Sequence, residues 1–259
     1  MIPEIFYLQF KICQSCIFII KLENRMDKNF KQLIDARNSH LWKEMRSVYK
    51  IKLKEAGEPG YLTSFDNGKV TIMVDMENLN PHSFTHELLH LYMKPREVNV
   101  ASDLKSAVNK ENILNDIFSD SLLEHMGNCL EHVKMLPLYL ASGLRNQLFV
   151  RDFHKKVMDK KELWELSKSF YIDGIYSRDA IDKFMGEFFF IKTSNNPEFN
   201  YDDYFLGLKN IDSQLYASLL KFWEEWLYFE LGNAREKYQA MIDRFLGTLK
   251  TWKIDKPVL

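Results

Sequence analysis

Cysteine, proline and glycine are all scarce in this chain. Its 259 residues include three Cys, seven Pro and ten Gly. Three cysteines are too few for a disulfide framework, and their odd number indicates a reducing compartment, so we expect a cytoplasmic protein. So little glycine and proline excludes collagen-like and most disordered chains. A chain of this length can bury a large core without a structural metal, so any bound metal would serve chemistry.

A net charge of one sign is also absent. The 35 Lys and Arg are balanced by 36 Asp and Glu, which leaves a formal charge of −1. This balance argues against a protein that binds nucleic acid along a basic stripe. The sequence therefore predicts no nucleic-acid partner.

Long apolar runs are lacking as well. Residues 1–25 are apolar in composition, but polar residues interrupt them, and the unbroken run Cys16–Ile20 is far shorter than the ~20 residues that span a bilayer. We therefore expect no membrane partner. Met26 reads like an ordinary start, so residues 1–25 are interpreted as an apolar extension whose native status stays open.

The periodicity of apolar residues predicts helices, with one break into strands. Apolar residues recur at helical spacing over residues 27–56 and predict a long first helix. Next, Tyr61–Phe65 and Lys69–Met76 flank the turn sequence Asp66–Gly68, which predicts a β-hairpin. Asn80 before a proline then predicts a helix over residues 81–93.

Helical patterns continue to the end of the sequence. Residues 109–140 predict a long helix that is interrupted at Gly127, and the pattern stays helical from Asp152 onward. The aromatic residues near the end, among them Phe222 and Trp226, are expected in the core. The fold class predicted is therefore α+β, mainly α, with one small sheet.

The helix predicted over residues 81–93 contains an H-E-x-x-H sequence at His86–His90. Positions i and i+4 lie ~40° apart around a helix, so both imidazoles can reach one ion at ~2.0–2.1 Å, the usual Zn–N distance. Glu87 lies beside them and can take a proton from a metal-bound water. The spacing favours His86 and His90 as metal ligands and Glu87 as a general base.

In these features the sequence from Asp27 to Gly143 resembles the zincin metallopeptidases. The core of that family is a helix, a small sheet with an exposed edge strand, an H-E-x-x-H helix and a later helix with the third ligand. The resemblance implies that Zn²⁺ is the cofactor, that Glu87 activates water, and that Lys69–Met76 is the strand that lines the substrate. It implies hydrolysis of a peptide or protein substrate.

The resemblance also suggests a division of the chain. Residues 26–145 would form the core with the metal site, and residues 146–259 would form a helical region packed on that core. No motif in the second region indicates a function of its own.

The third metal ligand is not fixed by a motif. The downstream helix offers the acidic and imidazole candidates Asp116, Asp120, Glu124, His125, Glu131 and His132. We favour His132, because a polar stripe that includes Asn128 leads to it along one helix face. Asn128 would then support a ligand. Glu131 is the first substitute, and Glu124 and Asp116 stay open.

Two other classes of function fit the same residues. A zincin-shaped binding or regulatory protein would hold zinc without turning over a substrate. A helical interaction protein with an accidental H-E-x-x-H sequence would bind no metal. The intact Glu87 favours catalysis, whereas the lack of an unambiguous third ligand favours the non-catalytic alternative.

Overall fold

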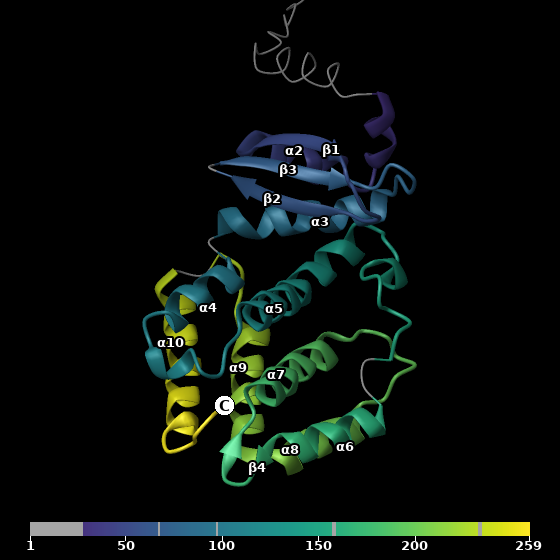
Figure 1. Ribbon diagram of the computed structural model, residues 1–259. Helices are drawn as coiled ribbons and strands as arrows, with labels where there is room; N and C mark the ends of the chain where they lie inside the picture. Colours follow the sequence, from purple (N-terminus) through teal and green to yellow (C-terminus); the bar gives the residue numbers. More distant parts are fainter. Residues whose placement is uncertain (1–27, 67, 97, 157–158, 233–234) are drawn as a thin grey trace, which may run out of the picture.

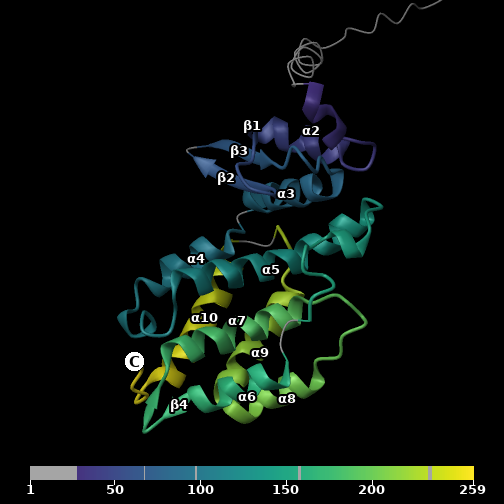
Figure 2. The same ribbon diagram turned by 45° about the vertical axis from the view of Figure 1, so that its right-hand side comes forward.

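The computed structural model of the protein describes residues 28–66, 68–96, 98–156, 159–232 and 235–259. The interpretation of residues 1–25 as an extension lies outside these residues. Figures 1 and 2 show a sheet with its helices at one end of the molecule and a larger group of helices beside it. We call residues 28–96 the sheet lobe and residues 98–259 the helical lobe. The predicted class, α+β and mainly α, is confirmed.

The sheet lobe is a three-stranded sheet covered on one face by helices. Its elements are η1 (Lys28–Leu33), α2 (Ser39–Val48), β1 (Lys50–Glu55), β2 (Leu62–Asp66), β3 (Lys69–Val74), α3 (Pro81–Met93) and the short η2 (Lys94–Arg96). The strand order is β1-β3-β2, with β1 parallel and β2 antiparallel to β3. Alternate residues of β3 are fully buried and pack with α2 and α3 in one apolar cluster.

Two sequence expectations for this lobe need correction. The prediction of one helix over residues 27–56 is wrong, because the chain turns after Leu33 and Lys50–Glu55 forms β1. Lys, Leu and Glu all favour helix. However, lysines alternate with apolar residues in this segment, which suits a strand with one buried face, and the segment pairs with β3 along its whole length. The β2–β3 hairpin is confirmed. However, the assignment of Lys69–Met76 as the substrate-lining edge strand is wrong, because β3 lies in the centre of the sheet.

The helical lobe contains the remaining elements. They are α4 (Val100–Val108), η3 (Asn112–Leu114), α5 (Asp120–Ala141), η4 (Asn146–Leu148), α6 (Lys160–Ser169), β4 (Tyr171–Ile172), β5 (Ile175–Tyr176), α7 (Arg178–Thr193), α8 (Asp202–Ile211), α9 (Ser213–Tyr228) and α10 (Arg235–Lys253). No described helix is both long and apolar enough to cross a bilayer. The larger apolar cluster of the protein fills this lobe.

The packing of aromatic residues holds α5 in place. Trp226 of α9 is fully buried and its indole nitrogen donates to the Leu130 carbonyl oxygen of α5 at 2.9 Å. Phe222 stacks on Phe245 with 4.0 Å between ring centroids. The expectation that Phe222 and Trp226 belong to the core is confirmed. Because α5 belongs to this same cluster, the boundary predicted at residues 145/146 falls inside one continuous core.

Helix α5 runs without a break through Gly127, contrary to the predicted interruption. A Cβ atom at Gly127 would lie 2.6 Å from the Cβ atom and 2.7 Å from the backbone nitrogen of Ala101 in α4. Glycine therefore serves here as the point where α4 approaches α5, and not as a helix end. Ser119 caps the start of α5 by accepting from the backbone N–H of Leu122.

This close approach predicts opposite effects for two Gly→Ala substitutions. Gly127→Ala should lower the free energy of unfolding by about 1–3 kcal/mol, because the added methyl group would clash with the backbone of Ala101. Gly247→Ala is the control: nothing lies within 4 Å of its Cβ position in α10, so the better helix propensity should raise stability by roughly 0.5–1 kcal/mol. Urea denaturation measures both. Stabilisation by both substitutions would contradict the packing argument.

Candidate metal centre

Helix α3 lies between the two apolar clusters of the protein (Figure 1). It begins as predicted, with the Asn80 side chain accepting from the backbone N–H of His82 at 2.8 Å and with Pro81 in the first turn. Its residues Phe84 and Leu88 face the sheet, and Leu89 faces the helical lobe. Apolar packing therefore covers two faces of the helix, and the histidines lie on a third.

The structure brings together the three histidines that the sequence selected. The Nε2 atom of His86 lies 3.2 Å from Nε2 of His90 and 3.2 Å from Nε2 of His132, which α5 supplies. Ligand atoms of all three lie within 4.8 Å of one another. Within the described parts of the chain, this is the one group of three or more potential ligands with that spacing.

The two distances of 3.2 Å from His86 are close to those between ligand atoms on one tetrahedral metal ion. Two nitrogens bound at ~2.0–2.1 Å with tetrahedral angles lie about 3.3–3.4 Å apart. Hydrogen bonding is a poorer explanation, because His86 Nε2 carries at most one proton and has two nitrogen neighbours at the same distance. Three imidazoles with an open fourth position are the donor set of a catalytic zinc site.

Glu131 supports a histidine instead of joining the cluster. Its Oε2 atom lies 2.9 Å from Nδ1 of His90, and its Oε1 atom lies 3.7 Å from Nζ of Lys94. A carboxylate at Nδ1 places the proton there and leaves the lone pair of Nε2 directed at the centre of the cluster. Glu131 is only 5% exposed. Glu131, expected from the sequence as the substitute ligand, is therefore outside the group of clustered ligand atoms.

The other candidate ligands lie elsewhere. Asp116 pairs with Lys253, and Asp120 pairs with Lys105. Glu124 is exposed on α5. His125 faces α7, where its Nε2–H donates to the Gly186 carbonyl oxygen at 3.2 Å.

Glu87 stands at the wall of the cleft beside the histidines. Its side chain is 9% exposed, and its Oε2 atom accepts a hydrogen bond of 2.7 Å from Oγ1 of Thr63. Thr63 belongs to β2, the edge strand next to α3. The sequence offered no signal for Thr63, because its role depends on the placement of β2 over α3.

A cleft of about 950 Å³ opens onto these residues. It is lined by both lobes, with Tyr61 and Ser83 from the sheet lobe and Val133 and Trp223 from the helical lobe. Asn128 also lines it, but among the described residues Asn128 makes no hydrogen bond to a histidine, so the supporting role expected for it has no contact behind it. The cleft reaches His86 and His132 of the cluster and the side chain of Glu87.

Burial keeps two of the histidines uncharged. It lowers the pKa of His132 from 6.5 to about 3, and the neighbouring His90 and His125 add to the shift. Burial, followed by His132 and His90, also holds the pKa of His86 well below its usual range. Both rings contact Phe149, at centroid distances of 4.9 Å for His86 and 5.3 Å for His132. Neutral imidazoles are the form that binds a metal.

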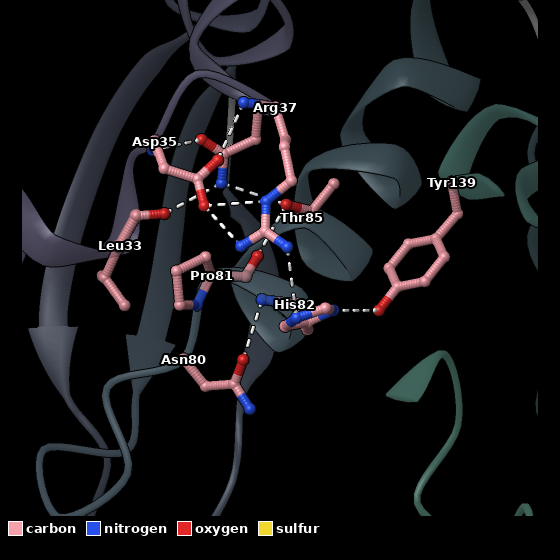
Figure 3. A network of polar contacts seen from close by, with 9 residues as sticks. Leu33, Asp35, Arg37, Asn80, Pro81, His82, Thr85 and Tyr139 are labelled. Atoms are coloured by element: carbon pink, nitrogen blue, oxygen red, sulfur yellow. Dashed lines mark hydrogen bonds and ion pairs between the residues drawn. The ribbon is translucent and has the colours of Figure 1, made fainter. Parts of the chain in front are cut away.

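A chain of hydrogen bonds beside the cluster joins the two lobes (Figure 3). Arg37, which can only donate, lies 3.4 Å from Nε2 of His82, and Nδ1 of His82 lies 3.1 Å from the Tyr139 hydroxyl. The hydroxyl donates to the carbonyl oxygen of Leu148 at 3.0 Å. Arg37 donates to Nε2, and Tyr139 uses its own proton for Leu148, so the hydroxyl oxygen accepts from His82 and the His82 proton lies on Nδ1. This series of hydrogen bonds holds Leu148 in place. The ring of the next residue, Phe149, covers His86 and His132.

Comparisons of the chain with models of protein families, with curated proteins and with solved structures find no match. Its function is therefore inferred from the site itself.

The low pKa of His132 predicts that the metal-free protein loses stability in acid. The unfolded chain binds a proton near pH 6.5, whereas folded His132 does so only near pH 3. Neutral His132 therefore contributes fully to the free energy of unfolding above pH 6.5. This contribution is lost as the pH falls toward 3, and about 2–3 kcal/mol of it is gone near pH 4.5. Urea denaturation of chelator-treated wild type and His132→Asn measures this, and the variant should show a shallower pH dependence. Parallel pH profiles would contradict it.

The contact between Glu131 and His90 predicts a loss of metal affinity in Glu131→Gln. The amide keeps the volume of the side chain but removes the charge that makes His90 a stronger ligand, so the affinity for Zn²⁺ should fall roughly 10–100-fold. Chelator competition measures the affinity. Glu124→Gln, on the exposed face of the same helix, is the control and should bind like wild type. An equal affinity of all three proteins would show that Glu131 does not act on the metal site.

Proposed function

We propose that this protein is a zinc-dependent hydrolase, and specifically a metallopeptidase. The observation that carries the proposal is the convergence of three Nε2 atoms, from His86, His90 and His132, beside the carboxylate of Glu87 in an open cleft. Glu87 adjoins a ligand position and has one oxygen held by Thr63. A histidine cluster built only for structure needs neither a nearby base nor a cleft.

The residues of the chain divide the chemistry among them. Bound Zn²⁺ would polarise the scissile carbonyl and lower the pKa of a water toward ~7. Glu87 then takes the proton of the attacking water and passes it to the leaving amine nitrogen. Thr63 occupies Oε2 of Glu87, which leaves Oε1 for this transfer. Glu131 keeps His90 oriented while charge develops at the site.

The substrate class follows from the sheet edge beside the site. β2 pairs with β3 on one side only, and its residue Thr63 touches the proposed base. A peptide added to this edge in extended form would lie along the cleft that contains Glu87. We therefore propose a peptide or an extended protein segment as substrate.

We place this activity in the cytoplasm. Cys129, the one cysteine among the described residues, is a free thiol buried in α5, and burial raises its pKa to about 12. Such a thiol is unreactive and packs as a small apolar group, as in proteins of reducing compartments. The scarcity of cysteine in the sequence supports the same location.

The decisive variant is Glu87→Gln. It should bind one Zn²⁺ per chain like wild type, because its side chain is not a ligand, but hydrolysis should fall at least roughly 100-fold without a general base. A library of quenched fluorescent peptides and metal analysis of untagged protein measure both properties. Glu77→Gln, an exposed carboxylate outside the cleft, is the control.

Two results would change the proposal. Hydrolysis by Glu87→Gln at the wild-type rate would refute Glu87 as the base. Stoichiometric zinc in a wild-type protein that cleaves no peptide would replace the peptidase with the zinc-binding regulatory alternative.

A further inference from the structure

The outer face of the sheet carries a group of lysines. β1 reads KIKLKE, and its alternation leaves Lys50, Lys52 and Lys54 exposed on one face while the residues between them turn toward the core. Lys69 of β3, also exposed, lies directly beside Lys50 in the register of the sheet. We call these four residues the lysine face.

No described element covers the lysine face. Helices α2 and α3 both pack against the opposite face, where β3 contributes its buried residues. None of the four lysines forms an ion pair with a described residue, although other lysines do. Four ammonium groups on adjacent strand positions therefore face solvent together.

Lys50 and Lys69 repel each other across neighbouring strands, and Asp66, which lies opposite Lys69 on β2, offsets part of this repulsion. Like charges directly opposite each other on neighbouring strands destabilise a sheet. Lysines on the edge strand β1 prevent unwanted strand pairing. Lys69, however, lies on the central strand, where there is no edge to protect. An anionic binding partner would remove the repulsion.

The other residues of this face favour a lipid surface over a nucleic acid. Leu62 is 64% exposed and pairs with the half-buried Met73, so apolar side chains lie among the lysines. The residues of β1, β2 and β3 that share this face include no aromatic ring on which a base could stack and no arginine for bidentate phosphate contacts. Asp66 at one corner is the acidic residue of the face. Lysines with scattered apolar groups suit the headgroup region of a bilayer.

Charge and sequence outside the sheet agree with this assignment. Residues 28–96 hold eleven Lys and Arg against eight Asp and Glu, although the whole chain has a charge of −1. The chain enters this lobe from residues 1–27, and the first 25 contain six Ile and three Phe. An apolar segment and a basic patch in the same chain are two signals that together give stable attachment to a membrane surface.

We propose that the lysine face docks the protein on a membrane surface rich in anionic phospholipid, without spanning it. The sequence alone predicts no membrane partner, because no apolar run is long enough to cross a bilayer; a surface contact has no such requirement. The face is separate from the metal-site cleft, so the proposal stands or falls independently of the peptidase activity.

Sedimentation of the full chain with vesicles tests the proposal. Wild type should bind vesicles of phosphatidylcholine with phosphatidylglycerol, bind vesicles of phosphatidylcholine alone far more weakly, and dissociate at high salt. The triple variant Lys50→Gln, Lys52→Gln, Lys54→Gln should bind the anionic vesicles roughly 100-fold more weakly. The matched control is Lys209→Gln, Lys221→Gln, Lys237→Gln, which removes three exposed lysines of the helical lobe and should bind like wild type.

Three results with vesicles would overturn the proposal. They are equal binding of both vesicle types by wild type, equal binding by the lysine-face variant and wild type, and equal losses in the two triple variants. Binding of a single-stranded oligonucleotide without binding of either vesicle would also overturn it and would assign the face to nucleic acid. Circular dichroism confirms that both variants are folded, since all six lysines are exposed.

Discussion

The packing of α5 against α3 is the contact on which the candidate site depends. It places Nε2 of His132 at 3.2 Å from Nε2 of His86, although 45 residues separate the two histidines along the chain. Neither helix is free to move away from this position. α3 is buried on two sides by the two apolar clusters. Buried Trp226 of α9 packs against α5 and donates a hydrogen bond to its Leu130 carbonyl oxygen. The histidine cluster is thus built on two packed helices, as the ligand geometry of the proposed metal site requires.

The same contact sets the electrostatics of the site. Burial between the lobes strips water from His86 and His132 and keeps them neutral, which makes their lone pairs available. In the absence of a metal this burial stabilises the fold only above the ordinary pKa of histidine. Glu131 contributes a negative charge behind His90, on the side away from the cluster, where it strengthens the ligand without occupying a coordination position. Thr63 orients Glu87 from the sheet side, so each lobe supplies part of the chemistry.

Each lobe contributes different parts of the candidate site and of the surface. The helical lobe holds the larger core and supplies His132, Glu131 and much of the cleft wall. The sheet lobe supplies the H-E-x-x-H helix and the edge strand, and its outer face presents the lysine face. None of the four lysines of that face lines the cleft.

Local sequence by itself determined the helix over residues 81–93, the β2–β3 hairpin and the pairing of His86 with His90, because capping, turn chemistry and helical spacing act over a few residues. It also indicated the helix after the H-E-x-x-H sequence and favoured His132 as the third ligand, with the adjacent Glu131 as the first substitute, because only the polar stripe along that helix distinguished them. Tertiary structure placed His132, and not Glu131, against the other two histidines, and it decided the strand β1, whose sequence also suits a helix. Ligand selection and strand pairing depend on which surfaces meet across the fold, and no local pattern records that.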